Sequence, residues 1–77
     1  MERTWLRDIR KSLKFTHADV AKRCNIKRQY YGMIESGKSN PSVEVAKRIA
    51  AALNIDWTLF FEKSGNETLH ARSYSTA

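Results

Sequence analysis

Apolar residues recur with helical spacing along nearly the whole chain, and the clearest case is VEVAKRIAAAL at residues 43–53. Four of them follow one another at i, i+3, i+4 and i+7 and so share one helix face: Ala46, Ile49, Ala50 and Leu53. One proline, three glycines and the lack of long alternating apolar and polar runs argue against an all-β chain. The sequence therefore predicts an all-α fold, and 77 residues suffice for one domain with a modest core.

The same spacing predicts a helix over residues 4–14 and a shorter one over residues 17–24. The apolar stripe of the first is formed by Trp5, Leu6, Ile9 and Leu13. The inner face of the second is formed by Val20, Ala21 and Cys24.

Short polar residues mark the ends of the second helix. The Thr16 hydroxyl can accept from a free backbone N–H of the first turn, and Asp19 stands where a capping box reaches back to the cap residue. Asn25 stands where a left-handed residue ends a helix. We expect the second helix to stop at Cys24 or Asn25.

A third helix is expected after a tight turn, from Lys27 or Arg28 to Ser36, with Gly37 ending it. Gly32 lies in its interior, where glycine costs roughly 1 kcal/mol relative to alanine. The close approach of another helix or of a ligand would explain why glycine is tolerated there.

The fourth helix, residues 43–53, can be capped by Ser42 or Asn40 and ended by Asn54. Asp56 can cap a short fifth helix, WTLFFEK. The residues that follow have little apolar content and no clear period, so residues 63–77 are expected to form a polar, mobile tail.

Positive charge is concentrated at one end of the chain. Residues 1–28 hold nine Lys and Arg against three acidic residues, whereas residues 29–77 hold five of each, for a net charge of +6. A basic face indicates a polyanionic partner, either nucleic acid or an acidic membrane surface, although a merely solubilising surface has the same composition.

Several classes of protein are disfavoured by the residues present. A single cysteine, Cys24, and two distant histidines form no disulfide and have no zinc spacing, which fits a cytoplasmic protein without a metal or cofactor. The N-terminal region lacks the unbroken apolar stretch of a signal peptide or membrane span. No nucleophile, base and orienting residue can be named together, so an enzyme is not expected.

Residues 5–62 contain a set of motifs: LR..R in the first helix, a threonine before the second, a small Ala21, a turn ending in Ile26, IE.GK.NPS and the closing IAAALNI. This set resembles the Xre-type, or Cro/cI-like, helix-turn-helix regulators of bacteria and phages. The resemblance implies a compact five-helix, lambda-repressor-like DNA-binding domain over residues 1–62, with the motif itself at about residues 16–36 and a flexible C-terminal tail.

In such proteins the second helix of the motif enters the major groove and presents its N-terminal residues to the bases. The residues at the matching positions are Lys27, Arg28, Gln29, Gly32 and Met33. Arginine can fork onto guanine, glutamine can pair with adenine, and methionine offers an apolar surface to a thymine methyl. The glycine would let the helix backbone lie close to the duplex, and the competing interpretation is that it accommodates Tyr31 or a neighbouring helix.

The resemblance also implies phosphate contacts from the flanks of the motif, including backbone N–H groups of the loop after the third helix. The residues expected to take part are Arg10, His17, Tyr30, Ser36, Lys38, Ser39 and Asn40. His17 departs from the glutamine common in the family, which puts its partner in doubt. Arg10 and Glu35 match a pair that the family often joins as a salt bridge between the first and third helices.

The segment WTLFF is richer in aromatic residues than a small core easily absorbs, so Trp57, Leu59 and Phe61 are candidates for dimer contacts. The alternative is that they close the core. The predicted function is a sequence-specific repressor that binds a double-stranded DNA operator, with no small-molecule ligand and no membrane. The rival function is a protein-interaction module, such as an antitoxin or antirepressor, that binds a protein partner and for which DNA binding is secondary.

Overall fold

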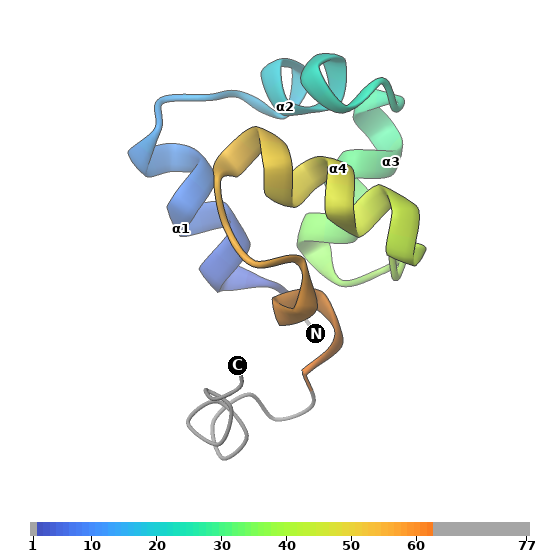
Figure 1. Ribbon diagram of the computed structural model, residues 1–77. Coiled ribbons are helices and arrows are strands. Elements are labelled where there is room, and N and C mark those ends of the chain that lie inside the picture. Colours follow the sequence, from blue (N-terminus) through green and yellow to red (C-terminus); the bar gives the residue numbers. More distant parts are fainter. Residues whose placement is uncertain (1, 63–77) are drawn as a thin grey trace.

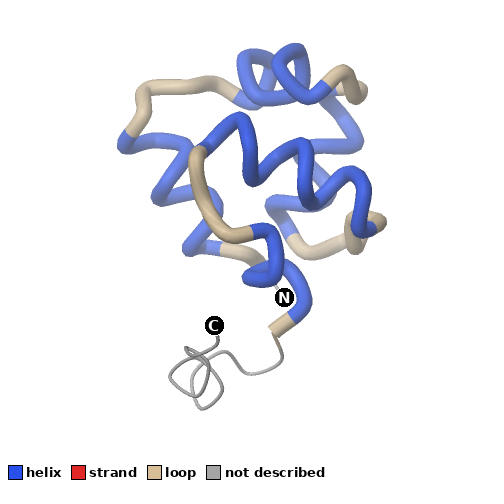
Figure 2. Tube along the Cα trace, in the orientation of Figure 1, coloured by secondary structure: helices blue, strands red, loops and turns tan. Residues whose placement is uncertain are grey.

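The computed structural model describes residues 2–62, which form four α-helices followed by one short 3-10 helix (Figure 1). The elements are α1 (Thr4–Ser12), α2 (His17–Cys24), α3 (Arg28–Ser36), α4 (Val43–Leu53) and η1 (Trp57–Phe61). The described residues contain no strand (Figure 2), and the predicted all-α class is confirmed. The expected tail, residues 63–77, lies outside the described residues.

Local hydrogen bonds fix the ends of α2 as the sequence predicts. Thr16 Oγ1 accepts from the backbone N–H of Asp19 at 3.0 Å, and the Asp19 carboxylate accepts from the backbone N–H of Thr16 at 2.8 Å. This is a complete capping box. Asn25 ends the helix in the left-handed region with φ of 59°.

The other predicted helix ends are also present. Gly37 and Asn54 are left-handed, with φ of 88° and 61°. Ser42, rather than Asn40, caps α4 and accepts from the backbone N–H of Val45 at 3.1 Å. Asp56 caps the last element by accepting from the backbone N–H of Thr58 at 3.0 Å, and that element is a 3-10 helix.

The first helix is shorter than predicted. It ends at Ser12, Lys14 turns into the left-handed region with φ of 63°, and Phe15 N donates to the carbonyl of Arg10 at 3.2 Å. Leu13 therefore leaves the apolar stripe of α1 and is 42% exposed. The prediction that Leu13 belongs to the inner face is wrong, because α1 ends before this residue and the chain turns at Lys14.

The core is assembled from the inner faces of all the helices. Figure 1 shows α4 crossing the middle of the bundle, with α1 and α3 on either side and α2 above. The buried apolar residues are Leu6, Val20, Ala21, Cys24, Tyr31, Ile34, Ala46, Ile49, Ala50, Leu53 and Phe60. The predicted inner faces of α2 and α4 are therefore confirmed, and the edge-to-face contact of Trp5 with Phe60 at 5.1 Å joins α1 to η1.

Candidate nucleic-acid interface

The N-terminal end of α3 presents polar side chains to solvent while its opposite face is buried. Tyr31 and Ile34 have no exposed surface. Lys27, Arg28 and Gln29, by contrast, are all exposed. Since α2 packs against α3 across a tight turn, the geometry is that of a helix-turn-helix motif whose second helix has its first turn free.

Gly32 lies on the same helix, beside the start of α2. A Cβ atom built on this glycine would meet only the imidazole of His17, at 3.5 Å from Nδ1 and 3.8 Å from Cε1. These are ordinary van der Waals distances, so the packing of residues 2–62 does not require glycine. Met33, the next residue, is half-buried.

A buried carboxylate holds α1, α2 and α3 together behind this surface. Glu35 is 4% exposed, and Arg10 donates to it twice, from Nε at 2.8 Å and from Nη2 at 3.0 Å. The Tyr31 hydroxyl donates to it at 2.8 Å, and His17 Nε2 lies 3.0 Å from its Oε1. The ion pair expected between Arg10 and Glu35 is thus present, and it is part of a four-residue cluster.

The cluster keeps Glu35 ionised. Burial by itself raises the pKa of the Glu35 carboxyl, but the hydrogen bonds from Arg10, Tyr31 and His17 outweigh it and lower the pKa below its ordinary value. The pKa of Arg10 is raised, chiefly by its hydrogen bonds to Glu35. Burial, followed by the hydrogen bond to Glu35, raises the pKa of Tyr31. With two hydrogen bonds from Arg10 and one each from Tyr31 and His17, the carboxylate accepts four, about as many as its lone pairs allow.

This arrangement changes what two of the expected phosphate contacts can do. Arg10 is 8% exposed and directs its remaining Nη1 to the carbonyl of Phe15 at 2.8 Å, so the structure does not leave it free for a phosphate. The side chain of His17 is one-third exposed, and its Nε2 is engaged by Glu35. Only Nδ1 of this histidine remains for an outside partner.

The loop after α3 was expected to supply a second phosphate contact. The backbone N–H groups of Lys38 and Ser39 both donate to the carbonyl of Met33, at 2.9 and 3.1 Å. They complete the end of α3 and are not available to a ligand. The side chains of Ser36, Lys38 and Asn40 are exposed, while those of Tyr30 and Ser39 are half-buried.

Arg3 holds this loop in place, a role that the sequence does not indicate. Its Nη1 donates to the carbonyls of Ile34 and Ser39 at 2.6 and 3.2 Å, and its Nη2 donates to Asn40 Oδ1 at 2.8 Å. Its backbone N–H also donates to the carbonyl of Glu35 at 2.8 Å. Burial lowers the pKa of Arg3. Since Arg3 donates to Asn40 Oδ1, the amide nitrogen of Asn40 is the group that this contact leaves able to donate to a ligand.

Comparison with known proteins agrees with this geometry. A helix-turn-helix family model matches residues 6–60, which is most of the chain. The chain belongs to the Xre-type helix-turn-helix family. The resemblance drawn from its motifs is therefore confirmed.

Three relatives of this helix-turn-helix protein illustrate the range of similarity. An uncharacterized HTH-type transcriptional regulator of Bacillus subtilis, YqaF, is 50% identical over 91% of this chain and 92% of its own length. The immunity repressor protein of Bacillus phage phi105 is 34% identical over 83% of this chain and 42% of its own length. An uncharacterized HTH-type transcriptional regulator of Methanothermobacter thermautotrophicus is 41% identical over 66% of this chain and 74% of its own length. No solved structure gives a significant match.

The aromatic end of this helix-turn-helix protein is only partly used by the core. Trp57 and Leu59 are half-buried, and Phe61 is 45% exposed. Phe61 contacts Trp57 edge-to-face at 6.0 Å, and Lys47 Nζ lies 5.0 Å from the ring of Trp57. Of the three candidates for dimer contacts, Phe61 is the one that the core leaves most exposed.

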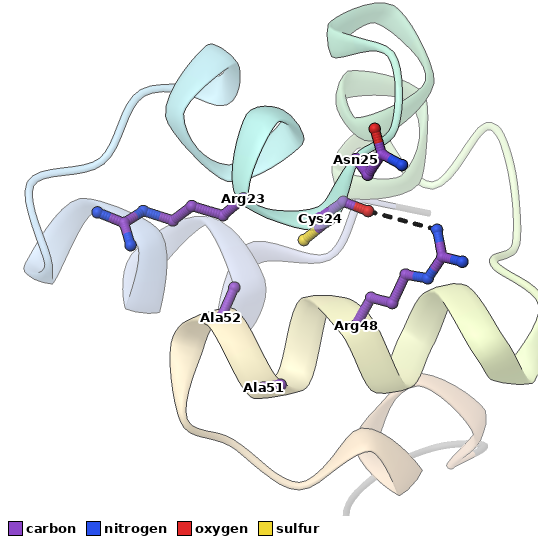
Figure 3. A pocket seen from close by; sticks show the side chains of 6 residues that line it. All are labelled: Arg23, Cys24, Asn25, Arg48, Ala51 and Ala52. Carbon is purple, nitrogen blue, oxygen red and sulfur yellow. Dashed lines mark hydrogen bonds between the residues drawn. The ribbon is translucent and has the colours of Figure 1, made fainter.

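A surface hollow lies between α2 and α4 (Figure 3), lined by Arg23, Cys24, Asn25, Arg48, Ala51 and Ala52. Arg48 reaches toward the Cys24 carbonyl and is also paired with Glu44 at 2.6 Å. The guanidinium of Arg23 lies over the Phe15 ring at 4.4 Å, and both arginines keep exposed surface. None of the expected DNA-contacting residues lines this hollow. Within residues 2–62 there is no group of metal-ligating side chains and no helix long and apolar enough to cross a membrane.

Proposed function

We propose that the protein is a transcriptional repressor that binds a double-stranded DNA operator in a sequence-specific way and reads the major groove with the first turns of α3. The proposal rests on one observation: three polar residues, Lys27, Arg28 and Gln29, are exposed at the start of a helix that the buried Glu35 cluster holds in place. The Glu35 cluster fixes α3 relative to α1 and α2, so the exposed turn can be presented in one orientation. Pre-organised side chains lose less freedom on binding.

The chemistry of the exposed residues suits base edges. The Arg28 guanidinium can donate two hydrogen bonds to O6 and N7 of guanine, and the Gln29 amide can pair with N6 and N7 of adenine. Met33 offers an apolar contact to a thymine methyl, and Lys27 can reach a base or a phosphate. Gly32, which has no side chain, lets the backbone of α3 approach the duplex closely.

Phosphates would be held on both flanks of α3. On one side the proposed donors are the side chains of Ser36, Lys38, Ser39 and Asn40, in the loop that Arg3 braces. On the other side His17 and Tyr30 stand near the start of α2 and of α3. Contacts of this kind set the register of the protein on the duplex but carry no sequence information.

The proposal extends to the assembly. A two-fold dimer formed through Phe61, with Trp57 and Leu59, would place two copies of α3 on half-sites about one helical turn, roughly 34 Å, apart. We further propose that residues 1–62 form the DNA-binding domain and that the protein acts in the cytoplasm. The proposed role agrees with the family match and with the names of two relatives, an HTH-type transcriptional regulator and a phage immunity repressor.

Selection of bound sites from random duplex DNA, followed by footprinting, tests this function. We expect the full chain to enrich a short motif that occurs as two inverted half-sites. Enrichment of a single half-site would contradict the proposed dimer but would still support sequence-specific contacts to the bases. Failure to enrich any motif would contradict sequence-specific binding and favour the protein-interaction module.

A further inference from the structure

The Glu35 cluster leaves one nitrogen of His17 without a partner. Nε2 lies 3.0 Å from the Glu35 carboxylate, while no hydrogen bond joins Nδ1 to any group of residues 2–62. Nδ1 and Cε1 face Gly32, where a Cβ atom would lie 3.5 and 3.8 Å away. The missing side chain therefore leaves this edge of the ring uncovered, beside the exposed first turn of α3.

The carboxylate decides which nitrogen of the neutral ring carries the hydrogen. Glu35 already accepts from Arg10 and Tyr31, and its lowered pKa keeps it ionised, so it acts only as an acceptor. A lone pair on Nε2 facing that oxygen at 3.0 Å would be repelled, and Nε2 must therefore be the donor. A neutral imidazole has one N–H, which leaves Nδ1 of His17 with a lone pair.

A phosphate of the DNA backbone also offers only acceptor oxygens. Neutral His17 would face it with a lone pair, whereas the imidazolium would face it with an N–H and a positive charge. We propose that DNA binding is coupled to protonation of His17: when the complex forms, Nδ1 of this histidine takes up one proton from solvent and donates it in a hydrogen bond to a backbone phosphate. This inference rests on the proposed function and assigns a pH dependence to the same site.

The charged groups that already surround the His17 ring have partners within the protein, so a bound phosphate would be the new charge near it. From α3 the titratable groups beside the ring are Glu35, whose Oε1 lies 3.0 Å from Nε2, and Tyr31, whose ring centroid lies 5.5 Å from that of the imidazole. From α1 Arg10 balances the charge of Glu35, and within α2 the nearest acidic residue, Asp19, is engaged by Thr16. The added negative charge of a bound phosphate therefore favours the protonated ring.

The expected effect follows from proton linkage. Histidine is the side chain that ordinarily changes charge between pH 5 and 8, whereas DNA phosphates, lysine and arginine keep theirs. Uptake of one proton raises the association constant as the pH falls, by at most about tenfold per pH unit for each subunit bound. We expect affinity at pH 6 to exceed that at pH 8 by roughly three- to tenfold per subunit at constant salt.

Three variants of the full chain isolate the contact. In His17→Gln the amide can donate without taking up a proton, so the DNA affinity that remains should no longer depend on pH. In Gly32→Ala the new methyl group stands in front of Nδ1, while His17 and its contact with Glu35 are retained. His70→Gln changes the other histidine, which lies outside the described residues, and should behave as the unmodified protein does.

Fluorescence anisotropy from pH 6 to 8 at fixed ionic strength would measure affinity for the selected duplex and for a random duplex of equal length. Calorimetry in two buffers of different ionisation enthalpy would count the protons taken up.

A pH-independent affinity of the unmodified protein overturns the proposal, as does a pH dependence that survives in His17→Gln or in Gly32→Ala. If His17→Gln does not fold, Gly32→Ala decides. Failure to bind either duplex at every pH would instead overturn the proposed function itself.

Discussion

Arg28 is the first residue of α3, and its side chain is exposed at the proposed reading surface. If it forks onto a guanine, Arg28→Ala should cost about 1 to 3 kcal/mol on the preferred site and much less on random DNA. Competition assays with single base-pair variants of the selected site would show the preference at one position disappearing. An equal loss of affinity for all duplexes would mean that Arg28 contacts a phosphate and not a base.

Gly32 offers a second prediction at the residue scale. Alanine is favoured over glycine in a helix by up to about 1 kcal/mol, and the added methyl group would meet only the His17 ring at an ordinary distance. Thermal unfolding should therefore show a higher midpoint for Gly32→Ala, by about 4–8 °C per kcal/mol in a domain of this size. DNA binding should nevertheless weaken, because the methyl group separates the helix from the duplex.

The two measurements on Gly32→Ala distinguish the explanations for a glycine inside α3. A lower midpoint would mean that packing requires the glycine after all. A higher midpoint with unchanged DNA affinity would contradict the close approach of a duplex while leaving the family assignment intact.

Among the elements, α1, α2 and α3 depend on one carboxylate for their mutual placement, which makes the stability of the bundle depend on pH. The pKa of folded Glu35 lies below its ordinary value of 4.5. The stabilisation that the ionised Glu35 provides is therefore fully present above about pH 4.5 and is lost as the pH falls through the folded pKa.

Tyr31→Phe tests this arrangement with little change of shape. It removes one hydrogen bond to a buried carboxylate, so the free energy of unfolding at pH 7 should fall by about 1.5–3 kcal/mol. The difference from the unmodified protein should shrink as the pH falls from about 4.5 through the lower pKa of folded Glu35. Urea denaturation between pH 7 and 3 measures both effects. An equal difference at every pH would mean that the hydroxyl stabilises α3 by packing alone.

At the scale of the whole molecule, charge sets how the protein responds to salt. Of the nine cations in residues 1–28, Arg3 and Arg10 are engaged inside the fold and Arg7 pairs with Glu2 and Asp8. The exposed ones are Lys11, Lys14, Lys22, Arg23, Lys27 and Arg28. Fewer cations are therefore available to DNA than the composition indicates.

We expect the logarithm of the DNA association constant to fall linearly with that of the salt concentration, by about 0.9 for each phosphate neutralised. Lys38→Ala should reduce that slope by about 1 and weaken specific and random duplexes about equally. Anisotropy titrations over a range of potassium chloride concentrations would measure the slope. A flat response would contradict the proposed phosphate contacts.

The helices and most of their ends could be predicted from the amino-acid sequence, because they depend on interactions within a few residues. The Thr16 and Asp19 capping box and the left-handed Asn25 join neighbours along the chain, and the inward faces of α2 and α4 follow from helical period alone. The family motifs added the expected ion pair of Arg10 with Glu35, which the structure contains.

The polar contacts across the bundle could not be predicted in this way, because they join residues that lie far apart in the sequence. Arg3 reaches the carbonyl of Ile34 and the side chain of Asn40, which are 31 and 37 residues away, and His17 reaches Glu35 over 18 residues. Leu13 left the predicted stripe because the chain turned at Lys14. Such long-range pairings depend on how whole helices pack and on which buried polar groups then need partners. Neither helical periodicity nor capping residues indicate them.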